Sequence, residues 1–180
     1  GAEAFVARAE PLLALRLGQA YSYRTEYERA LPLLERAGPG AEGLPSELRA
    51  EGWFWLGQAQ ERTGRFDEAA SSFERVLEVE PDNVDAMNYL GYMWADLGRN
   101  LERALELTTR AVAAEPENPA FIDSLGWALY RLGRHQEALD QLVFAFDPSQ
   151  RLVADRLWRD GLITAKALAG VCREAGATDA

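Results

Sequence analysis

The 180-residue sequence has few of the residues on which common cross-links and metal sites depend. It contains one cysteine, Cys172, so no disulfide can form within the chain. Its one histidine, His135, and a distant cysteine cannot supply the usual set of zinc ligands. No apolar run approaches the length of a membrane-spanning helix. We therefore expect no disulfide framework, no metal site and no direct membrane insertion.

Catalytic motifs are also missing. The sequence has no nucleophile elbow, no Ser/His/Asp order and no phosphate-binding Walker loop. A Gly-x-Gly-x-x-Gly string occurs at Gly38, Gly40 and Gly43, but a dinucleotide fingerprint must follow a strand and open a helix. Here the string follows a helical pattern and contains a proline, so we interpret it as a connecting loop. The sequence predicts no enzyme, no catalytic residue and no cofactor.

Lysine is nearly absent, and the chain is acidic overall, with a formal net charge of −10. Lys166 is the only lysine, and residues 1–150 carry 14 arginines against 25 acidic residues. Nucleic-acid-binding proteins need a basic stripe that neutralises phosphates, so this balance argues against a nucleic-acid partner. Because complementary charge speeds encounter and suppresses wrong partners, we expect a neutral or basic segment of a protein or peptide partner.

What the sequence does contain is a repeat. Leu56-Gly57, Leu90-Gly91 and Leu125-Gly126 are separated by 34 and 35 residues. Each pair is followed at similar offsets by a second glycine (Gly64, Gly98, Gly133) and then by an alanine (Ala69, Ala104, Ala138). A fixed period in this range is typical of helical repeat arrays.

The pattern has a physical explanation. The second glycine of each copy can take the left-handed conformation that ends a helix, so each copy predicts two helices joined by a tight turn. Small residues mark the places where two helix backbones approach closely. Pro81 and Pro116 then stop the second helix. One such pair cannot bury its own apolar face, so neighbouring pairs must stack.

These offsets resemble those of the tetratricopeptide repeat (TPR) family. The resemblance implies an all-α fold, a right-handed TPR superhelix (α-solenoid) of antiparallel helix pairs with a degraded C-terminal capping pair. Residues 1–10 are expected to end a preceding helix, which would make the chain part of a longer array. The remaining segments are expected to be a divergent TPR-like repeat with an inserted loop (11–44), three TPR copies (45–83, 84–118, 119–148), the capping pair (149–174) and a frayed tail (175–180).

The resemblance also implies where a partner binds, because the first helix of each TPR copy lines a concave groove. At the groove positions the sequence has aromatic and hydrogen-bonding residues, which suit peptide recognition. The alternative interpretation is that Tyr92 and Trp127 simply pack between helices. The predicted peptide-binding residues are Phe54, Gln58, Arg62, Asn88, Tyr92, Asp96, Asp123, Trp127, Tyr130 and Arg131.

Some TPR proteins bind acidic C-terminal tails through a clamp of lysine, asparagine and arginine side chains. The corresponding positions of this sequence contain no cation, so an acidic tail is not the expected ligand. Those positions are Phe54, Gln58, Tyr89, Ala120 and Ser124.

The predicted function is a non-enzymatic scaffold or adaptor that holds a partner peptide or helix. Two alternatives stay open: a regulatory or substrate-recruiting arm of a longer enzyme, and a module that self-associates through its N-terminal end. The stretch from Asn88 to Arg134 is similar to a bacterial TPR family, many of whose members are cell-envelope adaptors. This likeness implies the periplasmic side of the envelope, with the cytoplasm as the alternative.

Overall fold

The computed structural model describes residues 2–38 and 44–145, and these residues form helices without any strand. The predicted all-α class is confirmed. The predicted capping pair and tail, Cys172 and the glycines Gly40 and Gly43 lie outside the described residues. The helices are α1 (Ala2–Tyr23), α2 (Tyr27–Ala37), α3 (Ser46–Arg62), α4 (Phe66–Val79), α5 (Val84–Leu97), α6 (Leu101–Ala114), α7 (Pro119–Arg131) and α8 (His135–Ala145).

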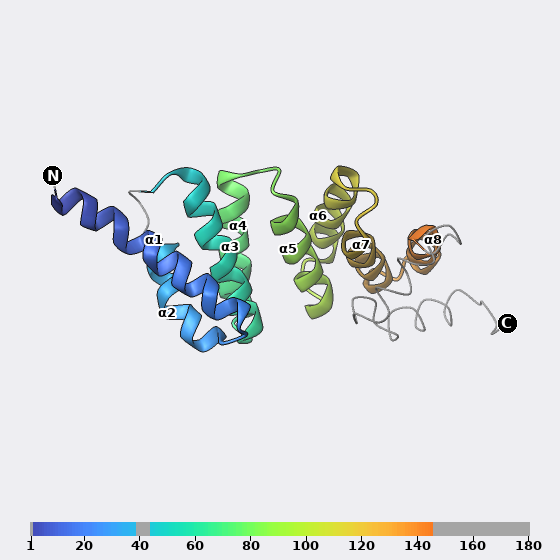
Figure 1. Ribbon diagram of the computed structural model, residues 1–180. Coiled ribbons are helices and arrows are strands. Elements are labelled where there is room, and N and C mark those ends of the chain that lie inside the picture. Colours follow the sequence, from blue (N-terminus) through green and yellow to red (C-terminus); the bar gives the residue numbers. More distant parts are fainter. Residues whose placement is uncertain (1, 39–43, 146–180) are drawn as a thin grey trace. The chain divides into compact units, whose positions relative to one another are not determined.

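The chain divides into two compact units, Gly1–Ala86 and Met87–Ala180. In unit 1, α1 packs against α2, α2 against α3 and α3 against α4 (Figure 1). In unit 2, Gly91 of α5 faces α6, α6 packs against α7, and α7 packs against α8. Within each unit, helices that are consecutive in sequence are therefore neighbours in space, as stacked helix pairs require.

One backbone turn joins the two helices of each copy. Gly64, Gly98 and Gly133 have φ angles of 78°, 67° and 77°, which confirms the predicted left-handed turn. The residue after each glycine donates its N–H to the carbonyl five residues earlier, the longer hydrogen bond of a Schellman motif. Thr25 occupies the same place in the first copy and takes the same left-handed conformation at φ 59°, which is unfavourable for a β-branched residue. The first copy thus keeps the left-handed turn although threonine replaces the glycine.

The small residues lie where helices cross most closely. A Cβ atom added to Gly18 would meet the Leu34 side chain at 2.6 Å, and one added to Gly57 would meet the Phe73 ring at 3.0 Å. Phe73 and Leu34 are themselves completely buried. The first helix of a pair therefore accepts a large side chain of the second helix against its bare backbone.

The connections between copies also repeat. In Glu80-Pro81-Asp82-Asn83 the asparagine Nδ2 donates to Glu80 Oε2 at 2.7 Å, and its Oδ1 accepts from the N–H of Ala86 at 2.9 Å. Glu115 and Asn118 form the same pair at 2.8 Å before α7. The asparagine thus caps the next helix while its amide holds the preceding glutamate.

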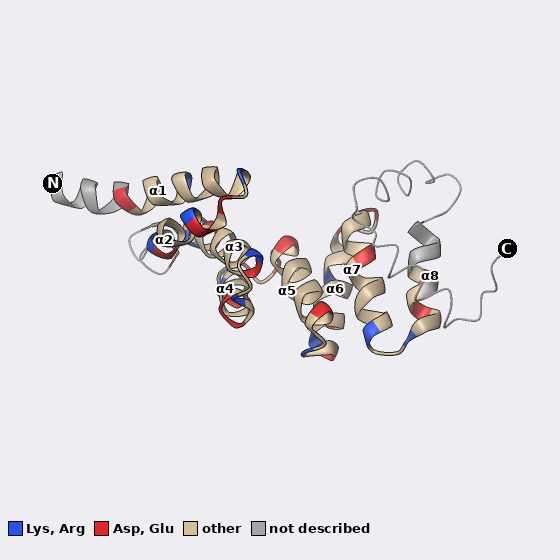
Figure 2. Cartoon of the chain, turned by 90° about the horizontal axis from the view of Figure 1, so that it is seen from below, with Lys and Arg blue, Asp and Glu red and all other residues tan. Residues whose placement is uncertain are grey.

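Several ion pairs lie on the second helices or at their starts, and Figure 2 colours the charged residues there. Arg65 pairs with Glu68 at the start of α4, and Arg134 pairs with Glu137 at the start of α8. Hydrogen bonding to the arginine lowers the pKa of each glutamate below its ordinary value. Exposed pairs of this kind contribute little to stability, so these charges form a solvated surface.

One predicted boundary is wrong. The sequence predicts that residues 1–10 end a separate helix and that Pro11 opens the next one, but α1 runs from Ala2 to Tyr23 with Pro11 inside it. Proline at this point removes one backbone hydrogen bond, to the carbonyl of Ala7. The preceding residues are mostly alanine and glutamate, which favour helix, and the helix continues through the proline.

We predict that Gly91→Ala destabilises the protein by roughly 1–3 kcal/mol through overpacking. The added Cβ would meet Thr108 Cγ2 at 2.8 Å and the Ala104 carbonyl oxygen at 3.0 Å, and both partners are buried. Alanine is otherwise the better helix former by about 1 kcal/mol, so a net loss can only come from the crossing. Thermal unfolding measures the effect, and an unchanged or raised melting temperature would show that α5 and α6 do not cross here.

Candidate peptide-binding face

Helix α7 begins at a well-defined cap. Asn118 Oδ1 accepts the backbone N–H of Ala120 at 3.1 Å, and Pro119 occupies the first position, where its missing N–H costs nothing. One side of α7 carries Leu125 and Leu129, which are buried against residues of α6 and α8. Asp123 and Trp127 are four residues apart and share another side of the helix.

Aromatic rings extend along this side of α7. The rings of Trp127 and Tyr130 are stacked, with centroids 5.4 Å apart and planes inclined by 19°. Tyr130 lies in turn 5.3 Å from the ring of His135, the first residue of α8. His135 is not among the predicted site residues. Its position usually holds a tyrosine or phenylalanine in the repeat pattern, and this is the signal in the sequence that its ring would join the row.

Arg131 connects α7 to the end of α5. Its Nη1 donates to the backbone carbonyl of Asp96 at 2.5 Å, and its guanidinium carbon lies 5.5 Å from the centroid of the Trp127 ring. The Asp96 carbonyl is among the last of α5, where carbonyls have no partner within the helix and the helix dipole is negative. The arginine therefore stabilises a helix end and at the same time fixes α7 beside α5.

We name the seven predicted residues of unit 2 the α5–α7 face: Asn88, Tyr92, Asp96, Asp123, Trp127, Tyr130 and Arg131. Asn88 and Asp123 hold equivalent positions in consecutive copies, as do Tyr92 and Trp127. Tyr92 exposes 38% of its surface, and Asp96 is exposed. The other members are half-buried.

Three polar atoms of the α5–α7 face are buried without a hydrogen-bond partner. They are Asn88 Oδ1, Asp123 Oδ1 and Trp127 Nε1. Among the described residues of unit 2, no other buried side-chain nitrogen or oxygen lacks a partner. Each such atom costs roughly 1–3 kcal/mol, and buried polar groups in native proteins are rarely left unpaired. The face thus holds two acceptors and one donor that nothing in the described structure satisfies.

Burial also changes the acidity of Asp123. Loss of hydration raises the pKa of its carboxyl from the ordinary value of 3.8 to about 6. A desolvated carboxyl disfavours the charged form unless a cation or a donor compensates it. At neutral pH this group would gain from a cationic or hydrogen-bond-donating ligand.

The predicted residues of unit 1 have different surroundings. Phe54 packs edge-to-face against Phe73 of α4, with ring centroids 5.8 Å apart, so its ring belongs to the interface between α3 and α4. Gln58 is half-buried, and Arg62 is exposed and pairs with the adjacent Glu61 at 3.2 Å. The three share α3 of unit 1, but the Phe54 ring packs into the interface with α4.

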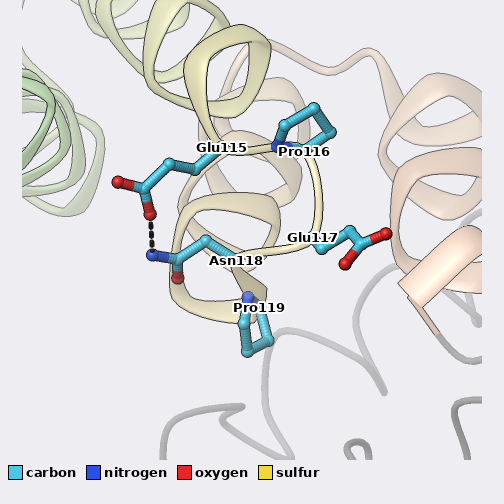
Figure 3. A pocket seen from close by; sticks show the side chains of 5 residues that line it. All are labelled: Glu115, Pro116, Glu117, Asn118 and Pro119. Atoms are coloured by element: carbon cyan, nitrogen blue, oxygen red, sulfur yellow. Dashed lines mark hydrogen bonds between the residues drawn. The ribbon is translucent and has the colours of Figure 1, made fainter.

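A shallow pocket lies at the connection between α6 and α7, and none of the predicted residues lines it. Its lining is the turn Glu115, Pro116, Glu117, Asn118 and Pro119 (Figure 3). Glu115 and Asn118 are hydrogen-bonded to each other there, and Asn118 also caps α7. We attribute this hollow to the shape of the turn.

Two kinds of feature are absent from the described part of the chain. Within it, the side chains of histidine, cysteine, aspartate and glutamate form no group that could hold a metal ion. No helix in that part is both long enough and apolar enough to cross a membrane.

Comparison with known families decides the classification. The family model described as tetratricopeptide repeat matches residues 15–73, 56–119 and 98–145. The chain belongs to the tetratricopeptide repeat family. A TPR array of this type is in general a scaffold for protein–protein interaction, and members of the family are typically not enzymes.

Several relatives share part of this array. The chain is 32% identical over 110 residues to the protein CTR9 homolog of Arabidopsis thaliana, covering 61% of this chain and 10% of that protein. It is 43% identical over 63 residues to the TPR repeat-containing protein PA4667 of Pseudomonas aeruginosa, covering 35% of this chain and 11% of that protein. The chain thus spans about a tenth of the length of these relatives.

Solved structures share the arrangement of the helices. The structure of a MamA mutant matches with a TM-score of 0.70 at 26% identity, over 92% of this chain and 88% of that one. MamA from Desulfovibrio magneticus RS-1 matches with a TM-score of 0.68 at 21% identity, over 95% and 98% of the two chains, and shows the fold alone. The predicted TPR fold is confirmed.

We predict that Asp123→Asn stabilises the protein above pH 6 and has little effect near pH 4. Folding raises the pKa of Asp123 from 3.8 to about 6 and so favours the protonated carboxyl. The wild-type protein therefore loses stability as the pH rises through this interval, whereas asparagine at this position does not titrate. A pKa shift of about two units corresponds to at most about 3 kcal/mol in the free energy of unfolding. Urea unfolding of the variant and the wild type between these pH values measures the difference.

The Asp96→Asn variant is the matched control, since it removes an exposed carboxylate of the same face. If the stability difference between Asp123→Asn and the wild type stayed constant across this pH range, it would contradict the burial of the Asp123 carboxyl.

Proposed function

We propose that the chain is a non-enzymatic scaffold that binds a peptide or helix of a partner protein on the α5–α7 face. The observation that carries this proposal is the set of three buried, unpaired polar atoms, Asn88 Oδ1, Asp123 Oδ1 and Trp127 Nε1. These atoms are closed to water in this structure, so a polypeptide segment reaches them only after the side chains over them move aside. Its N–H groups then donate to the two acceptors, and its carbonyl groups accept from the indole.

The aromatic residues of the face supply contact area. Tyrosine and tryptophan bury a large surface at a small cost in side-chain entropy, and they are enriched among residues that dominate binding energy. Trp127 is already oriented by its stacking on Tyr130 and by the Arg131 guanidinium over its ring. A prearranged ring loses little freedom when a ligand covers it, so the stacking favours binding.

The charge of the face supports a neutral or basic ligand segment. Asp123 is desolvated and has no partner for Oδ1, and Asp96 at the end of α5 is exposed. The one arginine of the face, Arg131, is already engaged with the Asp96 carbonyl and the Trp127 ring. A lysine or arginine of the ligand beside Asp123 would stabilise the ionised carboxylate, whereas an acidic segment would oppose it.

A second role is compatible with the same face. The matched relatives are much longer than this chain, which spans about a tenth of their length. The face could therefore serve as a substrate-recruiting arm for a catalytic domain in a longer polypeptide. The residues that bind would be the same, and only the consequence of binding would differ.

Selection from a random peptide library displayed on phage tests the proposal, because it requires no knowledge of the partner. We expect recovered peptides to be enriched in lysine or arginine and depleted in acidic residues. Trp127→Ala should weaken the binding of the selected peptides by about 2 kcal/mol or more if Trp127 is a central contact. Isothermal titration calorimetry measures the affinity, and thermal unfolding of the same variant measures stability.

Trp55→Ala is the matched control, since Trp55 is a half-buried tryptophan of unit 1 that contacts Tyr23. It should leave peptide affinity unchanged. A Trp127→Ala variant that loses stability but keeps its affinity would show that Trp127 only packs between helices. Selected peptides rich in acidic residues would contradict the charge preference.

A further inference from the structure

Arg131 of the α5–α7 face lies over a glycine to which the repeat pattern assigns only a turn. A Cβ atom added to Gly98, in the turn after α5, would lie 2.6 Å from Nη2 of Arg131 and 3.8 Å from its Cζ. The guanidinium therefore rests against the bare backbone of Gly98. A side chain at position 98 would displace this guanidinium, which is the far end of a flexible side chain and can move at little other cost.

The other two turn glycines have open surroundings. Gly64 and Gly133 take the same left-handed conformation, with φ angles of 78° and 77°. Among the described residues, a Cβ atom at either position would meet nothing within 4 Å outside its immediate chain neighbours. The positive φ angle accounts for all three glycines. At Gly98 the bare backbone has a second consequence, which is contact with a side chain of α7.

From this place the guanidinium makes two further contacts. Its Nη1 donates to the backbone carbonyl of Asp96 at 2.5 Å, and its Cζ lies 5.5 Å from the centroid of the Trp127 ring. A guanidinium can make both contacts because it is planar and carries several N–H donors, whereas a lysine ammonium is a compact charge. Arg131 thus connects the end of α5 to the Trp127 ring of α7.

The charge of Arg131 does not explain its place on this face. Asp123, Trp127 and Arg131 are spaced four residues apart, so they share one side of α7. We expect this side to receive a neutral or basic segment, and like charges oppose association. An arginine that acted only through its charge would therefore weaken binding. Its contacts indicate a different role, which concerns the position of the Trp127 ring.

We propose that Gly98 and Arg131 are positioning residues of the α5–α7 face. Gly98 leaves room for the guanidinium at the end of α5, and the guanidinium holds the Trp127 ring in place for the ligand. Residues that support a contact residue in this way determine how precisely a site is held. This inference rests on the proposed function, and it adds Gly98, which is not among the residues predicted from the repeat pattern.

The sign of an affinity change separates positioning from charge. In calorimetric titration with a lysine-rich peptide from the library selection, Arg131→Leu should weaken binding roughly threefold to fivefold, as expected for loss of an exposed cation–π contact. Arg131→Lys should weaken binding as well, although it keeps the charge. Stronger binding by Arg131→Leu, or unchanged binding by Arg131→Lys, would overturn the proposal.

Gly98→Ala disturbs the same contact from the side of α5. Its Cβ displaces the guanidinium, so it should weaken peptide binding to a similar degree. Gly64→Ala is the matched control, because it places alanine at a similar positive φ angle in unit 1 without meeting a side chain. Both variants strain a turn and should lower the melting temperature, but only Gly98→Ala should change the affinity. Equal affinities of the two variants would overturn the role of Gly98.

A double variant tests whether the two residues act together. If Gly98 acts only through Arg131, Gly98→Ala should weaken binding no further in a chain that already carries Arg131→Leu. The double variant should then have the affinity of Arg131→Leu alone. A double variant that shows the product of the two single losses would contradict the proposal, because the residues would then act independently.

Hydrogen exchange of the Trp127 indole N–H in the ligand-free protein gives a readout that needs no peptide. Trp127 Nε1 is closed to water in the structure, so loosening of the ring should speed exchange of its proton with solvent. We expect faster exchange in Arg131→Leu and Gly98→Ala and an unchanged rate in Gly64→Ala. An unchanged rate in Arg131→Leu would overturn the positioning role whether or not a peptide binds. Failure to select any peptide would instead contradict the proposed function, and the exchange rates would still decide this inference.

Discussion

The close crossing of paired helices is the constraint on which the rest of this structure depends. Bare backbone at Gly18, Gly57 and Gly91 lets a side chain of the second helix lie against the first helix. A Cβ atom at any of these positions would approach its neighbour to 3.0 Å or less. The crossing fixes the rotation of the first helix about its own axis, and this rotation decides which residues point into the pair and which remain available. Asp123 and Trp127 are available because Leu125 and Leu129 are buried on another side.

Much of this arrangement follows from the sequence, because its physical causes are local. Gly64, Gly98 and Gly133 end helices because glycine tolerates a positive φ angle, and the structure has all three in that conformation. The first copy shows the limit of this reasoning, since Thr25 adopts the same turn without being a glycine. The backbone hydrogen bond from Glu26 to Tyr21 maintains it there. Pro11 shows a second limit, because a proline at a plausible helix start lies within α1 instead.

The features of the candidate site that the sequence could not predict depend on distant partners. The repeat pattern placed Arg131 on the face, but its hydrogen bond to the Asp96 carbonyl depends on how the ends of α5 and α7 meet across 35 residues of sequence. The pattern likewise placed Asn88 and Asp123 at equivalent positions, but it could not show that their oxygens are buried without partners. Such facts result from packing, and a periodicity contains no information about them.

The α5–α7 face combines a stable framework with groups that are costly to leave unpaired. A scaffold selected for stability alone would replace Asp123 by an apolar residue, since its burial raises the pKa and disfavours the charged form. Binding sites retain such polar groups despite their cost in stability, because the ligand supplies the missing hydrogen-bond partners.

The indole N–H signal of Trp127 in a ¹H–¹⁵N NMR spectrum gives the most direct test of the central claim, that the unpaired groups of α5 and α7 receive a peptide. The sequence contains five tryptophans, so the indole signals are few and can be assigned by substitution. On titration with a lysine-rich peptide from the library selection, the Trp127 signal should move downfield, because Nε1 gains an acceptor that it lacks in the free protein. Binding that leaves the Trp127 signal unmoved while another indole signal shifts would contradict the account.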